Sequence, residues 1–104
     1  MYGLDNETVE RILTVFSKIT PISKVILYGS RAKGNYRNGS DIDITLFGEK
    51  LTLDNSVYPL MDELDDLYLP YLFDISIFEH IDDENMKEIA DFISEEKLFP
   101  YETE

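Results

Sequence analysis

Apolar residues recur three and four positions apart near the start of the chain, a spacing that places them on one face of a helix. These positions are Val9, Ile12, Leu13, Phe16 and Ile19. Asp5 or Asn6 is expected to cap this helix, with Glu7 in its first turn. Pro21 is expected to end it. We therefore predict an amphipathic helix that contributes to the core and carries no chemistry.

Three short apolar runs predict the strands of one sheet. Lys24–Tyr28 is nearly all apolar, which favours a central, buried strand. Asp41–Phe47 is the second run and Leu72–Phe78 is the third. Strand residues two apart point to the same side of a sheet. The third run therefore divides into one face with Phe73, Ile75 and Ile77 and another with Leu72, Asp74, Ser76 and Phe78.

The connections between these runs contain turn signals and a second helix. We expect a short helical turn over Ser30–Gly34, a tight turn at Asn38–Gly39 and a loop over Gly48–Asn55. Ser56 is expected to cap the second helix, with Pro59 in its first turn. The positions expected to face the core are Val57, Leu60, Met61, Leu64, Leu67 and Tyr68. The acidic positions expected on the solvated side are Asp62, Glu63, Asp65 and Asp66.

The C-terminal part of the chain predicts one more helix and a tail. Asp82 or Asp83 is expected to cap this helix, and Glu95–Tyr101 forms the tail. The inward positions of the helix are Met86, Ile89, Ala90 and Ile93. A chain of 104 residues suits one domain with one modest core. We therefore predict a single α/β (α+β) domain over residues 1–104, with a small mixed sheet flanked by helices.

The composition excludes several classes of protein. There is no cysteine, which rules out disulfides, thiolate nucleophiles and cysteine-based zinc sites. No apolar run approaches the roughly 20 residues of a membrane helix. The first residues lack a basic segment followed by an apolar stretch. We therefore expect a soluble cytoplasmic protein that does not bind membranes.

The charge of the chain is strongly negative and unevenly distributed. The net charge is −13, yet six basic residues and no acidic one lie between Arg11 and Ser40. Most of the acidic residues follow, from Asp41 to the end of the chain. An acidic body argues against non-specific nucleic-acid binding, which depends on Lys and Arg contacts with phosphates. The acidic excess instead favours metal ions and a basic protein partner.

Residues 29–43, GSRAKGNYRNGSDID, carry the candidate chemistry. A glycine after a strand lets backbone N–H groups approach an anion closely, and Ser30 adds a hydroxyl donor. Asp41 and Asp43 would share one face of a strand, where two carboxylates repel each other unless a divalent cation lies between them. Carboxylate oxygens suit Mg²⁺. A phosphate-binding turn beside paired metal-binding carboxylates indicates phosphoryl or nucleotidyl transfer.

At these residues the chain resembles a known family. Gly29-Ser30 followed by Asp41-x-Asp43 is similar to the motif of the DNA polymerase β-like nucleotidyltransferase superfamily. The fuller string GSRAKG…SDIDI resembles its smallest members, the minimal nucleotidyltransferases. The resemblance covers nearly the whole chain. It implies the nucleotidyltransferase fold and a third carboxylate on a later strand, a position that Asp74 fits.

The resemblance also implies how such a site works. Two Mg²⁺ ions are expected at Asp41, Asp43 and Asp74, with Asp74 orienting or deprotonating the acceptor hydroxyl. ATP is the expected substrate. The residues expected to hold its phosphates are Gly29, Ser30 and Arg31, with Lys33 and Arg37 as further candidates.

Minimal nucleotidyltransferases similar to this chain are paired with small helical HEPN-family toxins and can transfer AMP from ATP to a toxin tyrosine. The resemblance therefore implies an antitoxin with a HEPN-type partner, in a homo- or hetero-oligomer. Two alternatives stay open. One is a non-catalytic module that neutralises its partner by contact. The other is a small-molecule nucleotidyltransferase completed by another subunit, although the chain lacks the length for the usual extra substrate domain.

Overall fold

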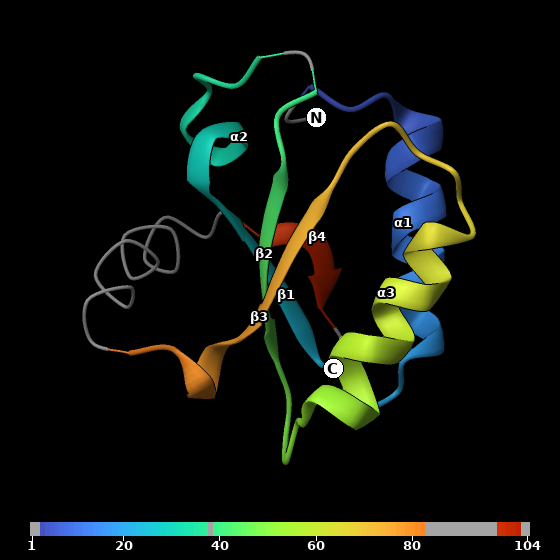
Figure 1. Ribbon diagram of the computed structural model, residues 1–104, viewed down its shortest axis with the longest axis vertical. Helices are drawn as coiled ribbons and strands as arrows, with labels where there is room; N and C mark the ends of the chain where they lie inside the picture. Colours follow the sequence, from blue (N-terminus) through green and yellow to red (C-terminus); the bar gives the residue numbers. More distant parts are fainter. Residues whose placement is uncertain (1–2, 38, 83–97, 103–104) are drawn as a thin grey trace.

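Figure 1 shows a sheet with two helices that lie side by side on one of its faces. This structure, a computed structural model, describes residues 3–37, 39–82 and 98–102. The strands are β1 (Lys24–Tyr28), β2 (Ile42–Phe47), β3 (Phe73–Ile77) and β4 (Leu98–Glu102), in the order β3-β2-β1-β4. β2 and β4 are antiparallel to β1, whereas β3 is parallel to β2. The predicted mixed sheet with β1 as an inner strand is confirmed.

Helix α1 (Asn6–Lys18) forms where the apolar spacing predicts it. Asp5 is its N-cap, and the Asp5 carboxylate accepts a hydrogen bond from the Thr8 N–H at 2.7 Å. Because this hydrogen bond favours the charged form, it lowers the pKa of Asp5. The helix buries Val9, Ile12, Val15 and Phe16.

The core lies between the sheet and the two long helices (Figure 1). The alternation in each strand decides which side chains enter it. The strand residues of this core are Val25 and Leu27 of β1, Ile42, Ile44 and Leu46 of β2, and Phe73, Ile75 and Ile77 of β3. The predicted division of the third strand into two faces is therefore confirmed. The opposite face of the sheet carries the polar side chains of β2 and β3.

The second helix begins earlier and ends earlier than predicted. A π-helical turn, η1 (Leu53–Val57), precedes α3 (Tyr58–Asp65). Thr52, rather than Ser56, is the N-cap: its hydroxyl accepts from the Asn55 N–H at 3.1 Å, and the Asn55 side chain accepts from the Thr52 N–H at 2.8 Å. Ser56 is buried and donates its hydroxyl to the Thr52 carbonyl at 2.6 Å. The expected loop therefore ends at the Thr52–Asn55 capping box.

Two residues assigned to the core face of this helix were predicted wrongly. Met61 is exposed, and so is Tyr68, which lies beyond the end of α3. The helix stops at Asp65, and Tyr68 adopts the left-handed conformation with φ of 53°. The helical spacing therefore no longer applies at Tyr68. The other expected positions, Val57, Leu60 and Leu64, are buried, and Leu67 packs against the core.

The C-terminal prediction also changes. Leu98–Glu102 is not a tail but the edge strand β4, which pairs with β1 with a register shift between Lys24 and Ile26. Pro100 is compatible with an edge strand because such a strand leaves one row of backbone groups unpaired. The predicted last helix lies outside the described residues. Within the described ranges, no helix is long and apolar enough to cross a membrane.

Replacing Asp5 tests its role as the cap. Its lowered pKa means that its contribution to stability is complete above the ordinary value of 3.8 and is lost as the pH falls through the folded pKa. Asn also caps helices but does not titrate. We expect Asp5→Asn to lose less stability than the wild type on acidification from about pH 7 to about pH 3. Asp5→Ala should be less stable than both at pH 7.

Urea unfolding at the two pH values measures these differences. The same acid dependence in the wild type and in Asp5→Asn would contradict the assignment.

Candidate active site

Three side chains form a row across the face of the sheet that lies opposite the helices. Asp43 of β2 pairs with Tyr28 of β1 on one side and with Asp74 of β3 on the other. Residues paired in this way point to the same side, and neighbouring strands are about 4.8 Å apart. Asp74 is exposed and Asp43 is half-buried. The fold thus places two carboxylates, 31 positions apart in the sequence, next to each other.

Asp41 lies just outside this row. The predicted strand began at Asp41, whereas β2 begins at Ile42, so Asp41 is the last residue of the preceding loop. Its side chain is exposed. Among the described residues, no three His, Cys, Asp or Glu side chains lie close enough together to hold a metal ion. The pair Asp43–Asp74 is therefore formed by the sheet, while Asp41 is positioned by the loop.

Helix α2 (Gly29–Lys33) begins directly beside the acidic row, at the end of β1 (Figure 1). Gly29 is buried with φ of +75°, a conformation that favours glycine. A methyl group at Gly29 would overlap the Asp43 carboxylate, so this carboxylate lies against the first residue of the helix. Tyr28 gives the helix no side-chain cap, and Ser30 lies in its first turn. The predicted phosphate-binding turn and the acidic pair are thus neighbours in space.

Arg31 is almost completely buried, with 2% of its surface exposed. Its Nε and Nη2 atoms donate to the Ser40 carbonyl at 3.1 and 2.9 Å. The guanidinium carbon also lies 5.2 Å from the ring centre of Tyr36 and 4.8 Å from that of Tyr71. Arg31 therefore ties α2 to the residue before Asp41. A direct contact between Arg31 and phosphate stays a prediction.

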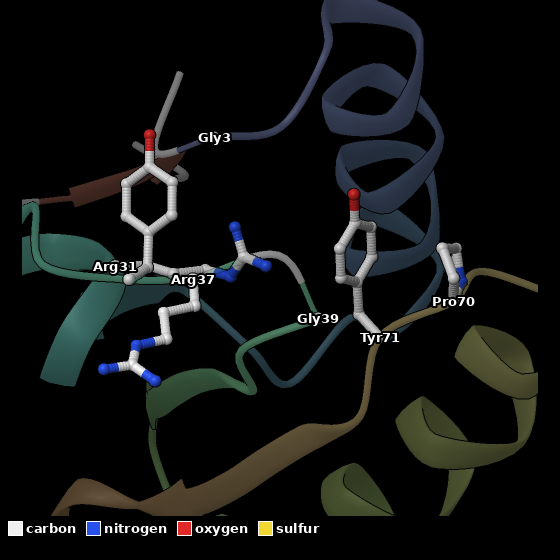
Figure 2. A pocket seen from close by; sticks show the side chains of 7 residues that line it. Gly3, Arg31, Arg37, Gly39, Pro70 and Tyr71 are labelled. Atoms are coloured by element: carbon white, nitrogen blue, oxygen red, sulfur yellow. The ribbon is translucent and has the colours of Figure 1, made fainter.

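Figure 2 shows the hollow into which Arg31 and Tyr71 extend. It has a volume of about 280 Å³ and is lined by Gly3, Arg31, Tyr36, Arg37, Gly39, Pro70 and Tyr71. Tyr71 packs against the core, and neither Asp43 nor Asp74 lines the hollow. The other basic candidates, Lys33 and Arg37, are exposed. The sequence gives no signal for the contacts of Arg31, because no local pattern sets the path of the loop that holds Tyr36 and Ser40, and Tyr71 belongs to a distant segment.

The donor atoms around the row suit a hard divalent cation. Two carboxylates on strands about 4.8 Å apart can both reach an ion that binds oxygen at about 2.1 Å. Two like charges this close would otherwise repel each other. Asp43 and Asp74 therefore have the donor atoms and the spacing of Mg²⁺ ligands. The exposed Asp41 is the nearest further carboxylate along the chain.

Comparisons with known proteins identify the family and the fold. A family model described as "Polymerase beta, Nucleotidyltransferase" matches residues 10–99, so the chain belongs to this nucleotidyltransferase family. A structure described as a toxin-antitoxin with AMP-PNP superimposes with a TM-score of 0.66 at 15% identity, covering 81% of this chain and 68% of that one. This similarity shows the shared fold. No curated protein matched the chain.

A second structure matches more weakly. It is described as a putative nucleotidyltransferase from Sulfolobus solfataricus, with a TM-score of 0.39 and 20% identity. The alignment covers 82% of this chain and 81% of that one. The family assignment rests on the family model, and the fold on the first structure.

Two glycines with similar backbone conformations test the contact between α2 and Asp43. Gly29 and Gly34 have φ of 75° and 85°, but only at Gly29 would a Cβ meet the Asp43 carboxylate. We expect Gly34→Ala to lower the free energy of unfolding by about 1 kcal/mol through backbone strain alone. Gly29→Ala should cost roughly 1–3 kcal/mol more because of the overlap. It should also weaken Mg-ATP binding, which Gly34→Ala leaves unchanged.

Urea unfolding and calorimetric titration of both variants measure these effects. If both variants lost the same free energy of unfolding and kept their nucleotide affinity, Gly29 and Asp43 would not form one site.

Proposed function

We propose that this chain is a Mg²⁺-dependent nucleotidyltransferase that moves AMP from ATP to a hydroxyl group, and that the acceptor is a tyrosine of a HEPN-type toxin. The observation that supports it most is the row of Asp43 and Asp74 beside Gly29. It places two carboxylates that suit a metal ion beside a helix N-terminus that carries the Ser30 hydroxyl. Nucleotidyl transfer needs both a metal site and a phosphate-binding site. In this proposal the chain is the antitoxin of the pair.

Each residue has a separate task in the proposed reaction. The backbone N–H groups at the start of α2 hold the triphosphate, because such groups point out from a helix N-terminus, and the Ser30 hydroxyl in the first turn is a further donor. Asp41 and Asp43 would bind the cation that accompanies the nucleotide, and the pair Asp43 and Asp74 would bind a second cation beside the acceptor hydroxyl. Asp74 orients the acceptor hydroxyl and takes its proton. When bound, Mg²⁺ would neutralise charge on the phosphates and make the attacking hydroxyl more acidic. The acceptor oxygen forms a bond to the α-phosphorus while the bond from this phosphorus to the oxygen of the β-phosphate breaks, and pyrophosphate leaves.

The surroundings of the row favour an acceptor that arrives from outside. Asp74 and Asp41 are both exposed, so a tyrosine on another protein can reach them. Nothing in the described part of the chain forms a second domain around the row. The similarity to a toxin-antitoxin structure that contains AMP-PNP supports a toxin as partner and an adenine nucleotide as substrate. A binding-only antitoxin would have no use for the acidic row.

Replacing Asp74 should separate chemistry from binding. Asp74→Asn should lower the transfer rate by about 10²-fold or more, because the general base is lost. Its Mg-ATP affinity should fall much less. Asp41→Asn combined with Asp43→Asn should abolish transfer and also Mg-ATP binding, because the ligands of the cation are removed. Glu7→Gln combined with Glu10→Gln on α1 is the control with the same change in charge.

The assay incubates the protein with labelled ATP, Mg²⁺ and the product of the neighbouring gene, beside calorimetric titration of Mg-ATP. Full transfer by Asp74→Asn would remove Asp74 from the proposed mechanism. Neutralisation of the partner without label transfer would support the binding-only antitoxin, and label on a small molecule would support the third alternative.

A further inference from the structure

Large apolar side chains are exposed mainly on one region of the molecule. Among the described residues, six such side chains are exposed, and five of them lie between positions 53 and 72. These five are Leu53, Tyr58, Met61, Tyr68 and Leu72, and the sixth is Tyr36. Exposed apolar side chains that gather in one place mark a contact surface more often than single ones do. The region covers η1, α3 and the segment that leads into β3.

Met61 and Leu72 come together at a shallow groove between α3 and the start of β3. The groove has a volume of about 130 Å³, and Leu64, Asp65, Tyr71 and Phe73 complete its lining. Leu72 has 74% of its surface exposed. β3 is the last strand on this side of the described sheet. Residues of α3 and of the segment that leads into β3 thus line one shallow, mainly apolar groove.

The charges beside this groove are unfavourable for the isolated helix. Asp62 and Asp65 belong to the C-terminal half of α3 and Asp66 is its C-cap, and the last turn contains no basic residue. Acidic side chains at a helix C-terminus oppose the helix dipole by about 0.3–1 kcal/mol each. Two cations of α1 contact this helix and the turn after it, but through other groups than the three aspartates: Lys18 pairs with Glu63 at 3.4 Å, and Arg11 donates to the Leu67 carbonyl at 2.8 Å.

Tyr68 adds a second local cost at the same end of α3. It has a left-handed backbone, which non-glycine residues avoid, and its side chain is 90% exposed. Strained residues, misplaced charges and exposed apolar side chains are each tolerated when a functional surface requires them. Here all three occur within one helix and its C-terminal turn. Tyrosine is also among the residues that contribute most to protein interfaces.

We propose that this surface, formed by Tyr58, Met61, Tyr68 and Leu72 and bordered by Asp62, Asp65 and Asp66, binds an amphipathic helix of a protein partner. The apolar stripe of that helix lies in the groove between Met61 and Leu72, as in other helix-in-groove interfaces. Its flanks carry Lys or Arg, which pair with the three aspartates and offset the helix dipole. A second copy of this chain fits poorly because its own three aspartates would face these.

The inference rests on the proposed function only for the identity of the partner, which would be the toxin. The surface is formed by α3 and the segment before β3, whereas transfer depends on Gly29, Asp43 and Asp74. The two proposals can therefore fail separately. A protein that transfers AMP but does not bind a helical peptide would contradict the proposal for this surface and leave the proposed function intact.

A pair of synthetic helices tests the chemistry of the surface. Both are 20-residue amphipathic peptides with a leucine stripe, one flanked by lysine and the other by glutamate. We expect the lysine peptide to bind the wild-type protein at least 10-fold more tightly than the glutamate peptide. Met61→Ser combined with Leu72→Ser should weaken its binding about 10-fold without changing the charge. Fluorescence anisotropy at physiological ionic strength measures the affinities.

Two variants with the same change in net charge distinguish the contribution of these three aspartates to peptide binding from that of the overall negative charge. Asp62→Asn, Asp65→Asn and Asp66→Asn together should weaken lysine-peptide binding about fivefold. Glu7→Gln, Glu10→Gln and Glu49→Gln, which change three exposed carboxylates elsewhere, should weaken it less than twofold. All variants should keep the Mg-ATP affinity of the wild type.

Equal effects of the two charge variants, or unchanged binding to the Met61/Leu72 variant, would overturn the proposal. A dimer of the wild-type protein in sedimentation that Leu72→Ser dissociates would assign the surface to a second copy instead.

Discussion

The parallel pairing of β2 with β3 is the constraint on which the rest of the structure depends. Its register sets Ile42 against Phe73 and, one residue on, Asp43 against Asp74. A slip of one position would exchange the faces of β3 and send Asp74 into the core. Parallel strands also need a long crossover, and η1 with α3 supplies it. The same pairing thus creates the acidic row and places α3 over the sheet.

The register is maintained because the two faces of the strands have different partners. On the helix side, isoleucine and leucine side chains of β2 and β3 pack against α1 and α3. On the other side, the Thr45 hydroxyl donates to the Ser76 carbonyl and the Ser76 hydroxyl donates to the Ile44 carbonyl, each at 3.4 Å. These polar groups would be unsatisfied if they were turned into the core. Burial on one face therefore fixes the acids on the other.

Arg31 stabilises the second half of the site, at the end of β1. A buried guanidinium is costly unless its donors are satisfied. The Ser40 carbonyl and the rings of Tyr36 and Tyr71 meet that requirement. The result is a fixed distance between the start of α2 and the start of β2. Gly29 and Asp43, which flank a connection of 13 residues, consequently lie in contact.

The sequence predicted the strands well because they carry clear alternation or continuous apolar runs. β1 has the predicted bounds, and β2 and β3 differ only at their ends. Asp43 and Asp74 were named as site residues from spacing and resemblance, but their pairing depends on strand order, which no local pattern contains. Tyr68 was misassigned because helical periodicity does not show where a helix stops, and Met61 because it lies at the edge of the buried face of α3, beside a shallow groove. β4 was missed because it is short and contains Pro100, a residue that is unfavourable in most strands.

The central claim is that Asp41, Asp43 and Asp74, and no other acidic groups of the chain, bind the divalent cations with the nucleotide. Nuclear magnetic resonance with paramagnetic Mn²⁺ in place of Mg²⁺ tests it directly. With ATP present, a small amount of Mn²⁺ should broaden the amide signals of Gly29, Asp43 and Asp74 first, and Asp43→Asn should remove the effect. Broadening centred on Asp62, Asp65 and Asp66, with sharp signals at Asp43 and Asp74, would contradict the account.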